Sequence, residues 1–235
     1  AFADAVRFVG AATAMQVTAA QLLDPDYLKA RAKLIDMKRA QDFGHGRPPG
    51  GGTVYLAAAD SGGMMASMIQ SNFMGFGSGV VVPGTGISLQ NRGSGFTLEP
   101  GHANRVAPGK RPFQTIIPGF VSRGGAPVMT LGVMGGNMQP QGHTQVMVRI
   151  ADYGQNVQAA LDGPRFRLVQ GLEINLEPEF PKATREELAR RGHRIAQLPP
   201  GYMDFGCGQL IYRLKQQDGY AAASDARRDS LAVGF

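Results

Sequence analysis

The residue whose surroundings point most directly to chemistry is Thr53, which follows three glycines and opens a short apolar run. Gly50, Gly51 and Gly52 leave the backbone free of side chains, and residues 53–60 (TVYLAAAD) are typical of a buried strand. A threonine hydroxyl is a weak nucleophile unless a base lies beside it, and a free α-amine on the same residue can be that base. Cleavage of the Gly52–Thr53 bond would create such a residue. The same pattern also fits an ordinary loop that enters a strand, so the rest of the chain must decide.

Composition limits the class of protein. The chain has 235 residues, of which 43% are hydrophobic and 18% charged, as in an ordinary globular protein with a sizeable core and one or two domains. No apolar run is long enough to span a bilayer, and residues 1–15 lack the features of a secretion signal. We expect no membrane partner. The location depends on sequence upstream, with a cytoplasmic location slightly preferred over a periplasmic or secreted one.

The cysteine and histidine content argues against metal chemistry. Cys207 is the single cysteine, which excludes an internal disulfide and a multi-cysteine metal site. The four histidines are scattered without the spacing of metal ligands. The sequence therefore predicts no metal and no cofactor.

The formal charge of +6 raises the question of nucleic-acid binding. Arginines cluster at 185–194 and at 227–228, but no aromatic residues are interleaved with them and no nucleic-acid-binding module is recognisable. A solvated helix face explains the first cluster better, so we expect no nucleic-acid partner. A positive field could also steer anionic substrates into a cleft.

Periodicity and turn residues predict a mixed layered fold of the α+β class. Residues 41–52 form a polar, Gly/Pro-rich linker that should be exposed and cleavable. The irregular region 73–109 is either functional or a flexible surface excursion. The last predicted helix should begin with a capping box, Thr184…Glu187. Strands are predicted at 53–60, 64–70, 113–121, 127–134, 172–177, 193–198, 207–214 and 219–224, and helices at 24–39, 136–150, 156–163 and 184–191.

Four separated motifs occur in the order seen in one family. They are QSNFMGFGSGVVVPGTGISLQNRGSGF, GKRPFQTIIPGF, LGVMGGNMQPQGHTQ and AAASDARRDSLAVGF. From about Gly50 to Phe235 the chain resembles the γ-glutamyltransferases, which belong to the N-terminal-nucleophile hydrolases. The resemblance implies an αββα four-layer sandwich. It also implies that residues 1–52 are the C-terminal end of a large subunit with its cleavable linker, and that residues 53–235 are the small, catalytic subunit.

The resemblance implies a role for each residue of the site. Thr53 would be the nucleophile, with its own amine as base after cleavage, and the Ser71 hydroxyl would hydrogen-bond and tune it. The backbone amides of Gly135 and Gly136, at a strand-to-helix junction, would stabilise the oxyanion, although a Gly-Gly turn can also serve sterics alone. The implied substrate-binding residues are Asn91, Arg92, Ser94, Gln114 and Thr115, the last two standing where the family has two serines.

The chain departs from the family pattern where the substrate is held. Ser94 and Gly95 stand in place of the paired acidic residues that grip the α-amine of a glutamyl group. Val54 and Tyr55 follow the nucleophile where the family has threonine and histidine. Loss of a carboxylate partner removes a charge-assisted hydrogen bond, about 1.5–3 kcal/mol or more than tenfold in affinity. The catalytic residues are thus retained while the glutamyl grip is altered.

These observations predict an amidohydrolase or acyltransferase that cleaves γ-glutamyl, glutathione-type amides after autocatalytic cleavage of a zymogen. A glutaryl or cephalosporin-type acylase is the alternative, since a glutaryl group lacks the α-amine. A non-catalytic fragment or pseudoenzyme is a further alternative, because 52 residues precede Thr53 and block its amine. The expected partners are a small-molecule amide and the large subunit from the same precursor, with a dimer of heterodimers as one candidate assembly.

Overall fold

The computed structural model describes residues 18–33, 53–96, 98, 100, 106–109, 117–170, 173–198, 204–214 and 219–235. The chain divides into two compact units, Ala1–Gly50 and Gly51–Phe235, and each is described by itself. None of the described helices is long and apolar enough to cross a membrane.

The described part of the first unit, residues 18–33, contains two short helices, α2 (Ala19–Leu22) and α3 (Pro25–Ala32). Asp24 caps α3, because its side-chain oxygen accepts hydrogen bonds from the backbone amides of Asp26 and Tyr27 at 3.0 and 2.8 Å. Proline suits the first turn, where its missing N–H has no intrahelical partner. The predicted helix at 24–39 is confirmed over this span, and its part at 34–39 lies outside the described residues.

The described part of the second unit holds three sheets. The first is the antiparallel pair β1 (Thr53–Ala59) and β2 (Met65–Ser71). The second is antiparallel throughout, in the order β3 (Gly119–Arg123), β4 (Ala126–Met134), β8 (Cys207–Arg213) and β9 (Tyr220–Ser224). The third has the order β5 (Phe166–Gln170), β6 (Glu173–Leu176) and β7 (Arg194–Ile195). The helical elements are η1 (Arg92–Gly95), η2 (Gly136–Met138), α4 (Gln139–Ala151), α5 (Val157–Asp162) and α6 (Lys182–Arg190).

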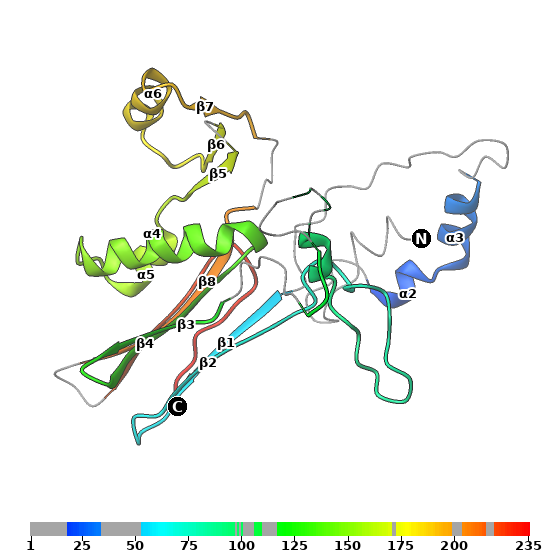
Figure 1. Cartoon of the computed structure of the whole chain (residues 1–235), viewed down its shortest axis with the longest axis horizontal. Coiled ribbons are helices and arrows are strands. Elements are labelled where there is room, and N and C mark those ends of the chain that lie inside the picture. Colours follow the sequence, from blue (N-terminus) through cyan, green and yellow to red (C-terminus); the bar gives the residue numbers. More distant parts are fainter. Residues whose placement is uncertain are drawn as a thin grey trace. The chain divides into compact units, whose positions relative to one another are not determined.

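Strand β4 separates two layers, because its side chains alternate between the two faces of the four-stranded sheet. On one face, β4 residues pack with apolar side chains of α4, α5, β8 and β9 into the main core. On the other face, Gly132 lies against Tyr55 of β1. A helical layer, the four-stranded sheet and the β1–β2 hairpin therefore follow one another (Figure 1). The members of the core are Met129, Leu131, Val133, Val146, Ala160, Leu161, Leu210 and Ala223.

Most predicted elements are confirmed, and two differences have physical causes. The capping box is wrong: α6 begins at Lys182 directly after Pro181, so Thr184 lies inside the first turn and makes no cap. Glu187 instead pairs with Arg190 and Arg191. Strand β5 was not predicted, because its sequence FRLVQ lacks a clean apolar alternation and becomes a strand by pairing with β6. The predicted strand at 113–121 is described only from residue 117 onward.

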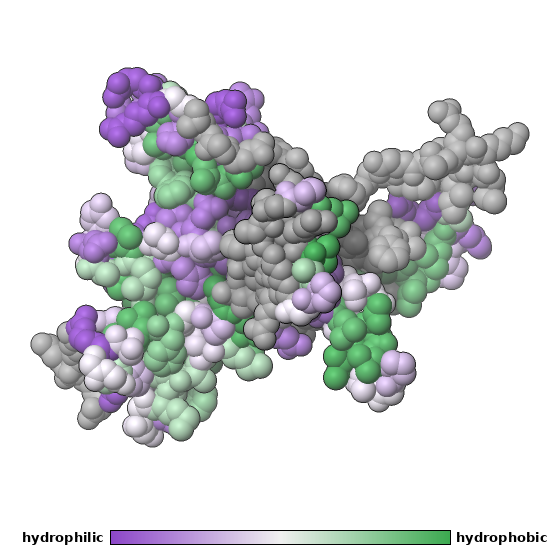
Figure 2. Space-filling model, viewed as in Figure 1, coloured by the Kyte–Doolittle hydropathy of each residue, from purple (hydrophilic) through white to green (hydrophobic). Residues whose placement is uncertain are grey.

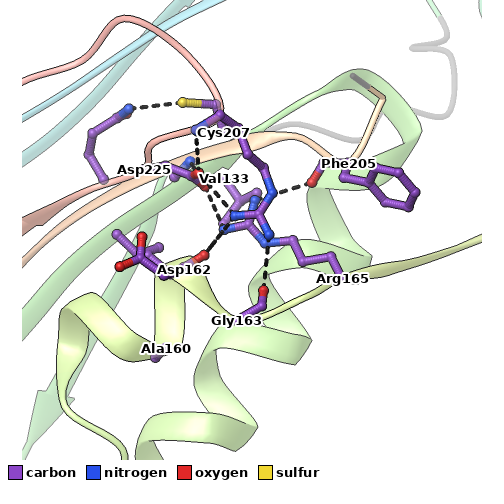
Figure 3. A network of polar contacts seen from close by, with 12 residues as sticks. Val133, Ala160, Asp162, Gly163, Arg165, Phe205, Cys207 and Asp225 are labelled. Carbon is purple, nitrogen blue, oxygen red and sulfur yellow. Dashed lines mark hydrogen bonds and ion pairs between the residues drawn. The ribbon is translucent and has the colours of Figure 1, made fainter. Parts of the chain in front are cut away.

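A buried ion pair ties the segment after β9 to the core. Arg165 and Asp225 are both fully buried, and the guanidinium Nη2 of Arg165 lies 2.6 Å from Oδ2 of Asp225 (Figure 3). The same carboxylate oxygen accepts the amide of Gly208 at 2.9 Å, and Arg165 also donates to the carbonyls of Phe205 and Leu161 at 3.2 and 3.1 Å. Burial lowers the pKa of Arg165 and the charge of Asp225 raises it, but an arginine keeps its proton.

A second arginine, Arg227, extends this network to Glu177, which follows β6, and to the carbonyl of Leu161 in α5. Arg227 donates from Nε and Nη2 to the two carboxylate oxygens of Glu177, and from Nη1 to Asp225 at 3.0 Å. Burial alone lowers the pKa of Arg227, but the hydrogen bonds to Glu177 and the charge of Asp225 outweigh burial and raise it. Two arginines and two carboxylates thus neutralise one another inside the unit, and a buried charge is tolerated only when it is paired in this way.

The ion pair gives the first prediction. Asp225→Asn should lower the free energy of unfolding by about 3–5 kcal/mol, because it leaves the buried Arg165 guanidinium without its anion. Urea denaturation followed by circular dichroism measures the loss. Glu187→Gln is the matched control, since it removes a carboxylate that pairs with Arg190 and Arg191 at the surface, and it should change the midpoint only slightly. Equal midpoint shifts for the two variants would contradict the structural role of Asp225.

Candidate active site

Thr53 and Ser71 face each other across the β1–β2 ladder. The register pairs the two residues directly, and their hydroxyl oxygens lie 2.8 Å apart. Thr53 is 8% exposed, so its hydroxyl lies in a sheltered position at the start of the strand. Strand alternation is the cause, because Thr53 and Tyr55 point inward while Val54 points outward and is exposed.

The backbone next to Ser71 orients its hydroxyl. The amide of Phe73 donates to Oγ of Ser71 at 2.9 Å. The single proton of the Ser71 hydroxyl can therefore point at Oγ1 of Thr53. In that arrangement Oγ1 accepts from Ser71, and its own proton remains available to a base. A donor aimed at a nucleophilic oxygen stabilises the negative charge that develops as the proton leaves.

The turn after β2 is held in an unusual conformation. Phe73 has φ of 77°, the positive-φ conformation that a bulky side chain rarely adopts, and it is alone among the described non-glycine residues in doing so. Asn91 fixes the turn: its side-chain oxygen accepts the Met74 amide at 3.0 Å, and its side-chain nitrogen donates to the Met74 carbonyl at 3.3 Å. The backbone amide of Asn91 also donates to the carbonyl of Asn72 at 3.1 Å. Asn91 thus holds the turn that presents Ser71.

The other predicted substrate-binding residues lie in or beyond η1. Arg92 begins this short helix, and its guanidinium carbon lies 5.2 Å from the centre of the Phe73 ring. Ser94 donates its hydroxyl to the carbonyl of Asn91 at 2.9 Å. The helix has the sequence RGSG and holds no carboxylate. Gly52, Gln114 and Thr115 lie outside the described residues, so their assignments stay predictions.

Tyr55 joins strand β1 to the four-stranded sheet. Its ring is buried, and its hydroxyl lies 2.8 Å from Oγ of Ser67, which in turn donates to the carbonyl of Gly119 at 2.8 Å. Because the Ser67 proton is used on that carbonyl, the Tyr55 hydroxyl is the donor to Ser67. Burial raises the pKa of the Tyr55 phenol, and the hydrogen bond to Ser67 lowers it, with burial the stronger effect. Tyr55 therefore remains a neutral donor.

Gly132 on β4 is the surface on which the Tyr55 ring lies. A Cβ at this position would come within 2.3 Å of a ring carbon, a distance that real atoms do not reach. The missing side chain therefore sets how closely β1 and β4 approach. Strand β1 begins and strand β4 ends toward the same side of their sheets (Figure 1). Thr53 is two residues from Tyr55, and Gly135 is three residues beyond Gly132, so this contact relates Thr53 to the turn after β4.

The turn after β4 is built from two glycines in unusual conformations. Gly135 has φ of 135° and Gly136 has φ of 57°, and the carbonyl of Gly135 accepts the Met138 amide at 3.0 Å. Gly206 packs directly behind the turn, because a Cβ on Gly135 would lie 3.0 Å from its Cα. A Cβ on Gly206 would in turn lie 2.5 Å from the carbonyl oxygen of Met134. Close packing alone is therefore a sufficient reason for glycine at 135 and 206. The donation of the Gly135 and Gly136 amides to an oxyanion stays a prediction.

The buried ion pair holds the segment behind this turn. Arg165 donates to the carbonyl of Phe205, and Asp225 accepts the amide of Gly208, so both flanks of Gly206 are tied to one pair of charges. The thiol of Cys207 lies in the same segment, where burial raises its pKa. A desolvated thiol of this kind is unreactive. Within the described ranges, no three His, Cys, Asp or Glu side chains are grouped so that they could hold a metal ion.

The comparisons with known proteins identify the family. The model of the gamma-glutamyltranspeptidase family matches residues 1–235, so the chain belongs to this family. It is 36% identical to the glutathione hydrolase-like YwrD proenzyme of Bacillus subtilis, covering 92% of this chain and 41% of that protein. It is 35% identical to the oxamate amidohydrolase proenzyme of Klebsiella pneumoniae, with 94% and 42% covered. The chain thus spans about two fifths of the length of these relatives.

Solved structures agree with this assignment. A cephalosporin acylase from Bacillus halodurans is 46% identical to this chain, with a TM-score of 0.70 over 97% of this chain and 41% of that one. A gamma-glutamyltranspeptidase from Pseudomonas nitroreducens shares the fold with a TM-score of 0.66 at 24% identity. The α+β class of the N-terminal-nucleophile hydrolases, predicted from the sequence, is confirmed.

Sequence reasoning missed three residues on which the geometry of the site depends. Tyr55 stood out only as a departure from the family pattern, although its alternation with Thr53 indicated an inward direction. Phe73 and Gly132 gave no local signal, because an unusual φ and a contact between sheets both depend on residues far along the chain. Asn91 was predicted to bind substrate, and in the structure its amide is engaged by Met74.

The contact between the sheets gives the second prediction. Gly132→Ala should lower the free energy of unfolding by about 1–3 kcal/mol, because the added methyl group displaces the Tyr55 ring and with it β1. Gly219→Ala is the control, since a Cβ there meets nothing within 4 Å. Urea midpoints of the two variants provide the test. A Gly132→Ala protein as stable as the control would show that the ring has room to move.

Proposed function

We propose that the protein is an amidohydrolase or acyltransferase whose nucleophile is the hydroxyl of Thr53, freed by cleavage of the Gly52–Thr53 bond. The observation that carries the proposal is the hydrogen bond of 2.8 Å between the Thr53 and Ser71 hydroxyls, at the start of a strand and sheltered from solvent. A hydroxyl held by a second hydroxyl, whose own position the Phe73 amide sets, is prepared for proton loss.

The same hydroxyl would carry out both steps. In processing, Oγ1 of Thr53 attacks the carbonyl carbon of Gly52, the peptide nitrogen takes a proton and leaves as the α-amine, and water then hydrolyses the ester. In catalysis, this amine accepts the proton of Oγ1 as the oxygen attacks the substrate amide. Gly135 and Gly136 are the proposed oxyanion donors. Removal of one such donor typically costs about a hundredfold or more in rate.

Two features of the relatives support processing at this point. The named relatives from B. subtilis and K. pneumoniae are proenzymes. A solved gamma-glutamyltranspeptidase that is 25% identical is covered over 99% of its chain by 75% of this one. Residues 53–235 make up a little over three quarters of the present chain, which is close to that share. We therefore propose that residues 1–52 remain with a large subunit from the same precursor, and that dimers of such heterodimers form.

The substrate is proposed to be a γ-glutamyl amide of the glutathione type, with a glutaryl amide as the second candidate. One observation favours the second: η1, the segment of Ser94 and Gly95, offers no carboxylate to a substrate ammonium. Similar proteins carry names of both kinds. One solved structure is a cephalosporin acylase, and one curated relative is named a glutathione hydrolase-like proenzyme. Asn91, Arg92, Ser94, Gln114 and Thr115 are the proposed binding residues.

The third prediction concerns processing. The full-length protein should cut itself between Gly52 and Thr53, Thr53→Ala should stay intact, and Thr53→Ser should still be cleaved because it keeps the hydroxyl. Ser71→Ala should slow cleavage roughly tenfold or more, since a hydrogen bond to a charged group is worth about 1.5–3 kcal/mol. Intact mass and N-terminal sequencing follow the reaction. Efficient cleavage of Thr53→Ala in a protease-free preparation, or an uncut wild-type protein, would refute the mechanism.

The fourth prediction concerns the missing acidic pair. Wild-type protein should hydrolyse glutaryl and γ-glutamyl p-nitroanilides with similar kcat/KM, or prefer glutaryl. Gly95→Asp should shift the ratio toward γ-glutamyl by about tenfold, because it offers a carboxylate to the ammonium. Gly95→Asn is the matched control of equal size without charge. A strong wild-type preference for γ-glutamyl would mean that another residue binds the amine.

A further inference from the structure

Arg92 is a cation in an otherwise uncharged stretch of the chain. No other charged residue occurs between Asp60 and Glu99. The loop before it, residues 74–91, carries apolar side chains on its surface, which gather in one region of the molecule (Figure 2). Because the neighbouring residues are uncharged, none of them would pair with an ionic ligand in place of Arg92. The exposed apolar residues of the loop are Met74, Phe76, Val80, Val81, Ile87 and Leu89.

The turn that presents the nucleophile's partner also places Arg92. The guanidinium lies over the Phe73 ring at 5.2 Å, the Phe73 amide donates to Ser71, and Ser71 bonds Thr53. Three consecutive contacts therefore lead from the cation to the nucleophile. Stacking on the ring holds the long side chain and reduces the conformational freedom that it must lose when it binds a ligand.

The described residues give Arg92 no anionic partner. The ion pairs of the described chain involve other arginines and lysines, and none reaches Arg92. Burial lowers the pKa of its guanidinium, but an arginine keeps its proton in proteins. The positive charge of this partly buried side chain is not compensated by a carboxylate of the described residues. A planar guanidinium can bind a carboxylate through two parallel hydrogen bonds.

We propose that Arg92 is the specificity-determining cation of the Thr53 site and binds the free carboxylate of an acyl group that carries no ammonium. This assignment rests on the proposed function of Thr53. The same positive charge attracts a carboxylate and repels an ammonium, and no described carboxylate on η1 offsets that repulsion. The substrate class is therefore an amide of a dicarboxylic acid that lacks an α-amine, which is the second of the two candidates proposed above. The bond that breaks is the amide, while the second carboxylate remains ionised and pairs with Arg92.

The test compares an anionic and a neutral substrate of similar length on the processed, full-length protein. The substrates are glutaryl and pentanoyl p-nitroanilide, which differ in one terminal carboxylate. Arg92→Gln should lower kcat/KM for the glutaryl substrate roughly ten- to hundredfold, mainly through KM, and leave the pentanoyl substrate within about twofold. Arg92→Lys should retain part of the glutaryl activity, because it keeps the charge without the planar fork.

Arg123→Gln is the matched control, since it removes one exposed arginine from the end of β3, and both substrates should be unaffected. Equal losses on both substrates in Arg92→Gln would overturn the proposal and indicate a structural role. Unchanged glutaryl kinetics in that variant would also overturn it. Turnover of neither substrate by wild-type protein would instead reject the function proposed for Thr53, so the two failures are distinguishable.

Discussion

The packing of the Tyr55 ring on the bare backbone of Gly132 determines how the two facing sheets approach each other. The β1–β2 hairpin has two strands and little core of its own, and an isolated hairpin is marginally stable in water. The hairpin is positioned by this contact and by two consecutive hydrogen bonds. Tyr55 bonds to Ser67, and Ser67 donates to the carbonyl of Gly119. Thr53 is the first residue of this strand, so its position depends on the contact between Tyr55 and Gly132.

A second constraint acts on the turn after β4. Gly206 fits behind Gly135 because neither residue has a side chain, and the charges of Arg165 and Asp225 hold the segment on both flanks of Gly206. The aromatic contact thus supports the strand of Thr53, and the ionic network supports the turn after β4. Strand β4 connects the two supports, because it contains Gly132, ends just before Gly135 and contributes Met129, Leu131 and Val133 to the hydrophobic core.

Local features were predictable from the sequence, and contacts between distant segments were not. Periodicity was sufficient to predict the strands at 53–60 and 64–70, which pair as β1 and β2, and a helix that begins near residue 24. The positions of Thr53 and Ser71 on one face follow from the same local rule. The positive φ of Phe73 could not be foreseen, because Asn91 imposes it from across a long loop. Strand β5 likewise exists through its pairing with β6 and not through its own pattern.

Gly135 lies far from Gly206 and Asp225 in the sequence, although these residues support it in the folded protein. The order in which they are synthesised therefore differs from the order in which they pack. Gly135 and the strand of Thr53 leave the ribosome well before Gly206 and Asp225, and domains fold as their residues emerge. A nascent chain in that interval lacks Asp225, the carboxylate that pairs with Arg165 and accepts the amide of Gly208. The ionic network behind the glycine turn can therefore be completed only after Asp225 has been synthesised, although Thr53 and Gly135 are made much earlier.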